Sequence, residues 1–261
     1  MPSFLAKSIE SCTIRFCNTF EDYDKCIELQ RLVWNSVDLE LTSARIYIIS
    51  WNAGGFLLGA FTPEEELVGF LHTFPAHDEN NEAIYYSHML AIKPEWQNSG
   101  LGQMLKLRQR EQALERGIRL IVWTFDPLQS RNAHFNINKL GCVTRKYKVN
   151  LYGTATSSVF DEGIEADRLL AEWWVRSPRV ESVVANQSIT IPTDWPFVEI
   201  PYDFAAVRSQ DLAQARQWRY HVRSEFEKMF ADGLICAGFQ PGTSDRFSRY
   251  YFTDPEQLNL Q

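Results

Sequence analysis

A glycine-rich turn between a predicted strand and a predicted helix is the most chemically informative part of this 261-residue sequence. The turn reads Gln97-Asn98-Ser99-Gly100-Leu101-Gly102, and a histidine, His88, precedes it on the strand. A turn of this kind presents backbone N–H groups to an anion, with the positive end of the helix dipole behind them. The pattern therefore predicts a phosphate-binding site.

Two common phosphate-binding motifs do not fit the spacing. A nucleotide-hydrolase loop requires Gly-Lys-Ser/Thr, whereas Gly102 is followed by Gln103 and Met104. The dinucleotide-binding fingerprint requires a third glycine, and Leu105 occupies that position. Both readings are rejected, and the pattern Gln-x-x-Gly-x-Gly remains.

Hydrophobic patterning predicts the elements that position this turn. Residues 85–92 alternate, are rich in β-formers and are stopped by Pro94. Apolar residues after the turn recur at helical spacing as far as Gly117, a plausible helix stop. Residues 120–125 are apolar throughout, which is typical of a strand buried on both faces. A second predicted helix follows over residues 130–141.

This order of strand, phosphate loop, helix, strand, Asn-containing helix and Leu-Gly resembles the core of the GNAT superfamily of acyl-CoA N-acyltransferases. The run over residues 123–133 resembles a bacterial subgroup described as predicted acetyltransferases, with relatives associated with N-acylation of amino acids. The resemblance implies an α/β fold with a mixed, mostly antiparallel sheet flanked by helices.

The resemblance also implies the residues that bind coenzyme A. Backbone groups of Leu90, Ala91 and Ile92 would contact the pantetheine arm, which pairs with the strand like an added strand, and would supply the oxyanion donor. The pyrophosphate would lie on the backbone of Gln97, Asn98, Ser99, Gly100, Leu101 and Gly102. Asn132 resembles the family's asparagine near the pantetheine, with an ordinary helix-start residue as the alternative.

Acyl transfer to an amine requires a base, because an ammonium ion must lose a proton before it attacks. His88 resembles the histidine base of the arylalkylamine N-acetyltransferases; the alternative is a histidine that only packs on the sheet. Many family members place a tyrosine, which protonates the departing thiolate, where this chain has Ile137. Tyr147 or Tyr152 could replace it, or the thiolate could leave unaided.

The amino-acid composition limits the classes of binding partner that are expected. Acidic residues outnumber basic ones, 33 to 26, which disfavours nucleic acid and anionic membranes as partners. Residues 1–12 lack the apolar core of a secretory signal and no apolar run has membrane-spanning length, so a cytoplasmic protein is expected. The five cysteines are scattered and lack zinc spacing, so no metal is predicted and buried, reduced thiols are expected rather than a reactive nucleophile.

The chain is expected to contain a GNAT core over residues 12–155, a helical connector over 156–194 and an extension over 195–261. The extension reads as strand, helix and strand, and resembles a degenerate second GNAT half. Its long helix has an apolar face that must be covered, either by the first domain or by a second copy in a homodimer.

The sequence therefore predicts an N-acyltransferase that uses acetyl-CoA, or another acyl-CoA such as succinyl-CoA, with a small-molecule amine or an amino acid as acceptor. The rival hypothesis is a non-catalytic module that binds or senses acyl-CoA. The absence of the usual tyrosine at Ile137 favours the non-catalytic hypothesis, whereas the candidate base His88 counts against it.

Overall fold

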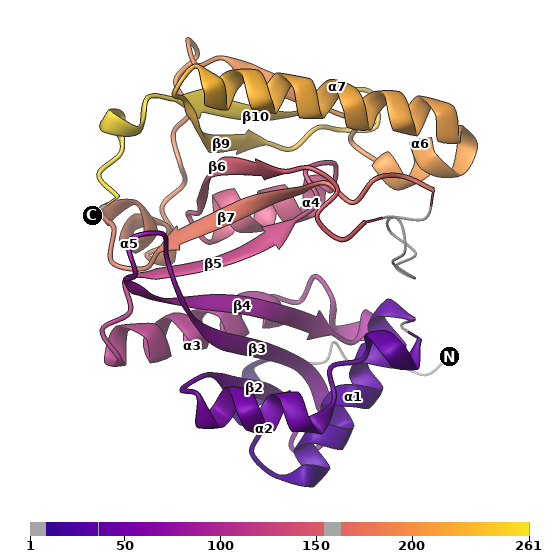
Figure 1. The fold of residues 1–261 in the computed structure, drawn as a ribbon, viewed down its shortest axis with the longest axis vertical. Helices are drawn as coiled ribbons and strands as arrows, with labels where there is room; N and C mark the ends of the chain where they lie inside the picture. Colours follow the sequence, from indigo (N-terminus) through magenta and orange to yellow (C-terminus); the bar gives the residue numbers. More distant parts are fainter. Residues whose placement is uncertain (1–8, 36, 154–162, 261) are drawn as a thin grey trace. The chain divides into compact units, whose positions relative to one another are not determined.

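The computed structural model describes residues 9–35, 37–153 and 163–260. The chain divides into two compact units, unit 1 (Met1–Ile118) and unit 2 (Arg119–Gln261) (Figure 1). This division does not follow the boundaries expected from the sequence, of which the one at 155/156 lies outside the described residues. Among the described residues, no helix combines the length and the apolar character needed to cross a lipid bilayer.

The strands of unit 1 pair antiparallel in the order β1 (Thr13–Phe16), β2 (Phe56–Phe61), β3 (Leu67–His77) and β4 (Ala83–Ile92). Strands β2 and β3 form an antiparallel hairpin. Every residue of β2 is buried, so this strand is covered on both faces.

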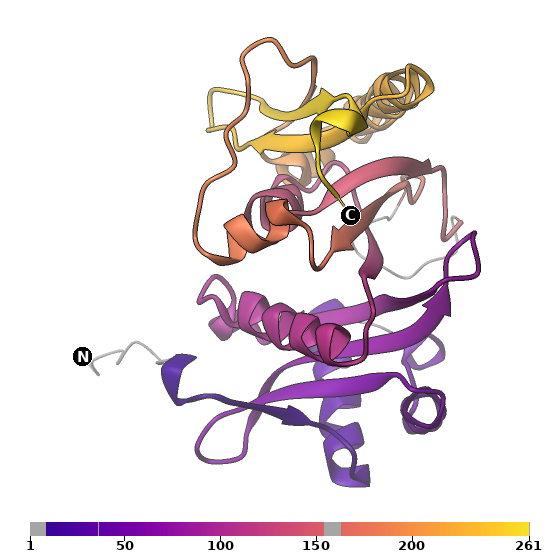
Figure 2. The same cartoon turned by 90° about the vertical axis from the view of Figure 1, so that its left-hand side faces the viewer.

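The helices of unit 1 lie on both faces of these strands. Helices α1 (Phe20–Trp34) and α2 (Ala44–Asn52) pack on one face, and α3 (Leu101–Glu115) packs on the other (Figure 2). Short 3₁₀ turns form at Ile9–Ser11, Asp38–Glu40 and Pro94–Trp96. Helix α2 was not predicted, because Ile, Tyr and Trp dominate it and Ser43 gives it no side-chain cap.

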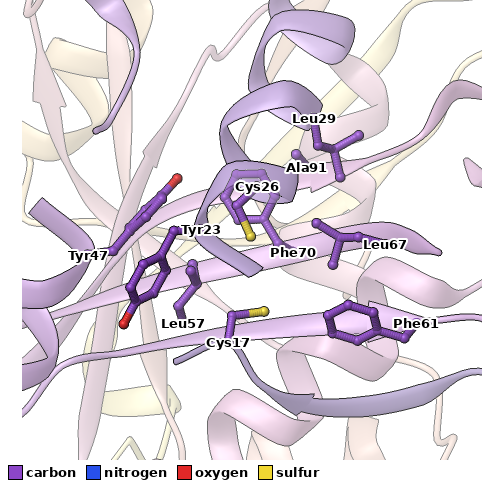
Figure 3. Close-up of a cluster of buried hydrophobic side chains, with 10 residues drawn as sticks. All are labelled: Cys17, Tyr23, Cys26, Leu29, Tyr47, Leu57, Phe61, Leu67, Phe70 and Ala91. Atoms are coloured by element: carbon purple, nitrogen blue, oxygen red, sulfur yellow. The ribbon is translucent and has the colours of Figure 1, made fainter. Parts of the chain in front are cut away.

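The core beneath α1 is apolar and includes two thiols. Figure 3 shows ten of its buried side chains: Cys17, Tyr23, Cys26, Leu29, Tyr47, Leu57, Phe61, Leu67, Phe70 and Ala91. None of the five cysteines forms a disulfide, and of the five only Cys12 is not buried, as expected for reduced structural thiols.

The strands of unit 2 also pair antiparallel. Their order is β5 (Leu120–Phe125), β7 (Arg168–Trp174), β6 (Val143–Lys148), β9 (Ile235–Gln240), β10 (Ser248–Thr253) and β8 (Phe197–Ile200). The helices are α4 (Ser130–Ala133), which continues as a π-helix (His134–Lys139), α5 (Pro178–Val184), α6 (Phe204–Gln210), α7 (Leu212–Ala231) and a 3₁₀ turn (Pro255–Gln257). Each unit is thus built from antiparallel strands flanked by helices, as predicted for the fold class.

The helical connector expected over residues 156–194 is wrong for its central part, which is strand β7. The sequence Arg-Leu-Leu-Ala-Glu-Trp-Trp is rich in helix formers, and this composition obscured the alternation of Leu169, Ala171 and Trp173, all fully buried. Strand β7 pairs with β5 on one side and β6 on the other. Pairing along both edges overrides the local helical propensity.

The extension is built into unit 2. Strand β9 meets β6 at the pair Thr144↔Cys236. The apolar face of α7 is covered by its own unit, since Phe226 packs on Tyr250, on Phe252 and on Tyr147 of β6. This face therefore needs neither another domain nor a second copy of the chain to cover it.

Candidate active site

The turn that precedes α3 has a backbone conformation that its glycine permits. Gly100 has φ +98° and Asn98 has φ +61°, both in the left-handed region. Ser99 Oγ donates to the Trp96 carbonyl at 2.7 Å and accepts from the Leu101 N–H at 3.3 Å. The first turn of α3 closes on the Gly100 carbonyl, which accepts two N–H bonds at 3.0 and 3.1 Å.

These bonds distinguish the turn residues that can face an anion. The Leu101 N–H is engaged by Ser99, whereas the N–H of Gly102 belongs to the first turn of a helix, where intrahelical acceptors are lacking. Gln97 Nε2 donates to the carbonyl of Ile92 at 3.2 Å, so its side chain braces the turn against the end of β4. The geometry offers the backbone of Gly100 and Gly102 as anion donors.

The ladder between β3 and β4 determines the directions of the backbone groups at the end of β4. The Lys93 N–H donates to the Val68 carbonyl at 2.9 Å. Because hydrogen-bonding direction alternates along an antiparallel pair, Ala91 is turned toward β3. The N–H groups of Leu90 and Ile92 are turned toward the other edge of β4, so these two can serve as donors to a ligand and Ala91 cannot.

His88 lies at a β-bulge. His72 pairs with Met89 and Thr73 pairs with Ser87, which leaves His88 as the extra residue of β4. A bulge bends its strand and changes the direction of the side chain that it carries. The histidine singled out by the sequence is thus presented by an irregularity that the sequence did not indicate.

Ser87 and Thr73, the paired residues next to the bulge, are hydrogen-bonded to α3. Lys106 Nζ donates to Ser87 Oγ at 2.9 Å, and Gln109 Nε2 donates to Thr73 Oγ1 at 2.7 Å. Both helix side chains are buried. The helix that begins at the glycine turn is therefore connected by buried hydrogen bonds to the strand positions next to His88.

The ring of His88 lies among other rings on the face covered by α1 and α2. Its centroid is 5.6 Å from that of His72 and 5.3 Å from that of Phe74, and its Nε2 is 3.4 Å from Thr42 Oγ1. His88 is nevertheless an exposed residue. Loss of water around the ring lowers the pKa of His88 below its ordinary value, so the neutral, basic form predominates at neutral pH.

The two tyrosines proposed as acids differ in their surroundings. Tyr147 donates its hydroxyl to buried Asp167 at 2.8 Å, and burial followed by that carboxylate raises the pKa of Tyr147 well above its ordinary value. Tyr152 is half exposed, and its hydroxyl is 3.0 Å from Thr124 Oγ1 at the end of β5. Ile137 is buried and supplies no proton. Of the two tyrosines, Tyr152 is better placed to exchange a proton, because it is half exposed whereas Tyr147 donates to a buried carboxylate.

Asn132 is exposed on α4, and Gln129 rather than Asn132 is the cap residue of that helix. Asp126 caps the turn after β5 by accepting the Leu128 N–H at 2.9 Å. Both of its oxygens also accept from buried Arg219. This carboxylate is thus already paired inside the protein.

Sequence patterns did not reveal three of the polar contacts described here. The Thr42–His88 contact joins residues 46 apart, and the Arg219–Asp126 pair joins residues 93 apart. The hydrogen bond from Lys106 to Ser87 connects α3 to β4. No local spacing signals such contacts. In the described part of the chain, no group of three or more His, Cys, Asp or Glu side chains is arranged to hold a metal ion.

Comparisons with known proteins identify a family that covers the segment containing the glycine turn. Residues 23–141 match the model of the acetyltransferase (GNAT) family. No curated protein matches the sequence. Two solved structures with a TM-score of 0.50 are a GNAT-family protein from Desulfovibrio desulfuricans, 16% identical over 63% of this chain and 99% of that chain, and the NatC complex bound to Gag peptide and CoA, 13% identical over 62% and 97%.

A third structure is the ribosomal-protein-S18-alanine N-acetyltransferase from Escherichia coli, 14% identical over 70% of this chain and 97% of that chain, with a TM-score of 0.49. At such identities, likeness to solved structures shows the fold alone, whereas the family model matches the sequence itself. The matched residues include β4, the glycine turn and α3. Residues 23–141 therefore match the acetyltransferase (GNAT) family, and over this segment the resemblance to the GNAT superfamily is supported by both sequence and fold.

Proposed function

We propose that the protein is an N-acyltransferase that moves an acyl group, by default acetyl, from acyl-CoA to the amine of a small molecule or amino acid. The observation that carries the proposal is the turn over residues 97–102, where left-handed backbone at Asn98 and Gly100 leads directly into α3. The turn lies inside the segment that matches the GNAT family model.

In this proposal the pyrophosphate of coenzyme A lies against the backbone of Gly100 and Gly102, at the positive end of the α3 dipole. Asn98 and Ser99 shape the turn, and Gln97 holds it to β4. The pantetheine arm runs along the outer backbone groups of Leu90 and Ile92. Asn132 is retained as a pantetheine contact because its side chain is exposed.

The chemistry begins when His88 accepts a proton from the acceptor ammonium group. The amine nitrogen then attacks the thioester carbonyl carbon, and the oxygen that gains negative charge accepts a backbone N–H bond from Leu90 or Ile92. The C–S bond breaks and coenzyme A leaves as thiolate, while the nitrogen of the new amide loses its second proton to the thiolate or to solvent. Because the lowered pKa of His88 keeps its ring neutral, the base is ready near neutral pH.

Departure of the thiolate needs little assistance, since thiols are much stronger acids than amines. Tyr152 is the proposed proton donor if one is used, because its hydroxyl is exposed and contacts only Thr124 among the described hydrogen-bonding groups. Tyr147 is a poorer acid in this role, since it donates to Asp167 and its pKa is raised.

A second candidate function is non-catalytic binding or sensing of acyl-CoA. It is favoured by the buried Ile137 at the usual acid position and by the engagement of Tyr147 with Asp167. It shares the coenzyme A site with the first proposal and differs in predicting no turnover.

One experiment separates the two. The full chain is incubated with acetyl-CoA or succinyl-CoA and pools of amines and amino acids, while free thiol release is followed and products are identified by mass. The proposal predicts thiol release that depends on one pool, together with an acylated amine. Binding of acyl-CoA without release above the rate of spontaneous hydrolysis in any pool would favour the sensing module.

A further inference from the structure

A buried glutamine on α1 fixes the segment that leads into α2. Gln30 is fully buried, and its amide pairs with both backbone groups of Thr42. Gln30 Oε1 accepts from the Thr42 N–H at 2.8 Å, and Nε2 donates to the Thr42 carbonyl at 3.1 Å and to the Tyr47 hydroxyl at 2.6 Å. Two bonds to one residue fix both its position and its orientation.

The side chain of Thr42 faces the bulge. Its Oγ1 is 3.4 Å from His88 Nε2, a long hydrogen bond of the kind that tightens when a substrate is bound. Within the described residues, this hydroxyl is the one hydrogen-bond partner of the His88 ring. A hydroxyl can donate to a neutral ring nitrogen or accept from a protonated one, so the contact persists in both charge states of His88.

The other neighbours of His88 cannot take this role. From β3, His72 and Phe74 present rings, and both nitrogens of the fully buried His72 lack a partner. From α2, Tyr47 packs on His72, with 4.9 Å between the ring centroids, and its hydroxyl accepts from Gln30. His72 and Tyr47 are the titratable groups on this side of His88, and neither contacts its Nε2.

We infer that Thr42 is a positioning residue for His88, held in place by Gln30, and that its hydroxyl sets the orientation and protonation equilibrium of the ring. The part that His88 plays in catalysis rests on the proposed function. The contact between Thr42 and His88 does not, and it can be tested without an acceptor.

The test is an NMR titration of the histidine rings in the full chain, with the His88 signals assigned by His88→Gln. Thr42→Val keeps the shape of the side chain and removes the hydroxyl, whereas Thr42→Ser keeps the hydroxyl. Ser43→Ala is the matched control, because Ser43 is the next residue and its side chain forms no cap bond. Thr42→Val should lower the pKa of His88 by about half a unit or more, since the bond to the charged ring is stronger than the bond to the neutral ring and its loss disfavours the charged form.

Thr42→Ser and Ser43→Ala should titrate like the parent, and Gln30→Leu should reproduce the effect of Thr42→Val. Once an acceptor is known, Thr42→Val should lower kcat about tenfold with an unchanged KM for acyl-CoA, and Thr42→Ser should restore it. An unchanged His88 titration in folded Thr42→Val would overturn the inference and leave the proposed function untouched. A shifted titration in a chain that acylates nothing would support the contact while the proposed function fails.

Discussion

Arg219 on α7 binds Asp126 at the end of β5 through two hydrogen bonds of 2.6 and 3.0 Å. Both side chains are nearly inaccessible, with 1% and 7% of their surfaces exposed. A buried charge without its partner is costly, so this pair attaches the C-terminal helix to the strand that opens unit 2. A further hydrogen bond, from the Tyr250 hydroxyl on β10 to the Pro127 carbonyl at 2.7 Å, joins another part of the extension to the turn after β5.

Breaking the buried pair should cost far more than breaking an exposed one. Arg219→Met should lower the free energy of unfolding by about 3–5 kcal/mol, because Asp126 is left charged and buried. Arg249→Met is the control, since Arg249 makes a similar two-bond pair with Glu199 at the surface and its loss should change stability little. Urea unfolding followed by circular dichroism measures both. Equal losses would show that burial adds nothing to the Arg219 pair.

Removal of the extension should destabilise what remains of unit 2. A chain ending at residue 194 loses β9, β10 and α7, so it exposes the edge of β6 and leaves Asp126 unpaired. Aggregated or molten protein is expected, judged by solubility and by loss of cooperative unfolding. A soluble fragment that unfolds cooperatively and keeps full affinity for coenzyme A would identify the extension as an independent accessory.

His72 should make the protein sensitive to acid. Burial, followed by the nearby His88, lowers the pKa of His72 to about 3, whereas in the unfolded chain it is about 6.5. Below pH 6.5 the unfolded chain therefore binds a proton that the folded protein does not, and stability falls as the pH decreases. Between pH 7 and pH 5 this group accounts for a loss of roughly 2 kcal/mol.

His72→Phe should remove that part of the pH dependence, because the ring stays and the titration disappears. Urea unfolding of parent and variant at both pH values gives the difference directly. If both proteins lose equal stability on acidification, burial of His72 is not the source of the sensitivity.

His88 should determine how the rate depends on pH. Its neutral form is the base, and its pKa is lowered, so the rate should rise with pH through a value below 6.5 and level off near neutrality. His88→Ala should reduce kcat about a hundredfold or more and abolish the rise of the rate with pH, while the affinity for acyl-CoA stays nearly unchanged. A variant that turns over like the parent would make His88 a packing residue.

Local patterns were sufficient to predict most of the elements. Strand β5 occupies the predicted residues 120–125, because a largely apolar run of this length has few alternatives. The left-handed backbone at Gly100 was not itself predicted, but glycine adopts it readily. Strand β7 was missed because its partners, rather than its helix-forming composition, make it a strand.

The glycine turn and His88 were selected as candidate site residues from their chemistry and spacing, and their roles stay predictions. The bulge that presents His88 depends on the register of β3 against β4, and the Gln30–Thr42 pairing joins two segments through side chains. Neither has a local sequence signature, so both had to be seen in the folded chain.

The most direct test of the central claim is the affinity of coenzyme A for two glycine variants at opposite ends of α3. Gly100 and Gly117 both have positive φ, +98° and +72°, so valine strains the backbone at either position. A side chain at Gly117 meets nothing within 4 Å. Calorimetric titration of the two folded variants should show at least about a tenfold loss of affinity for Gly100→Val, the cost of losing one hydrogen bond to a charged group, and none for Gly117→Val. Equal affinities in the parent and both variants would contradict the assignment of the glycine turn as the coenzyme A site.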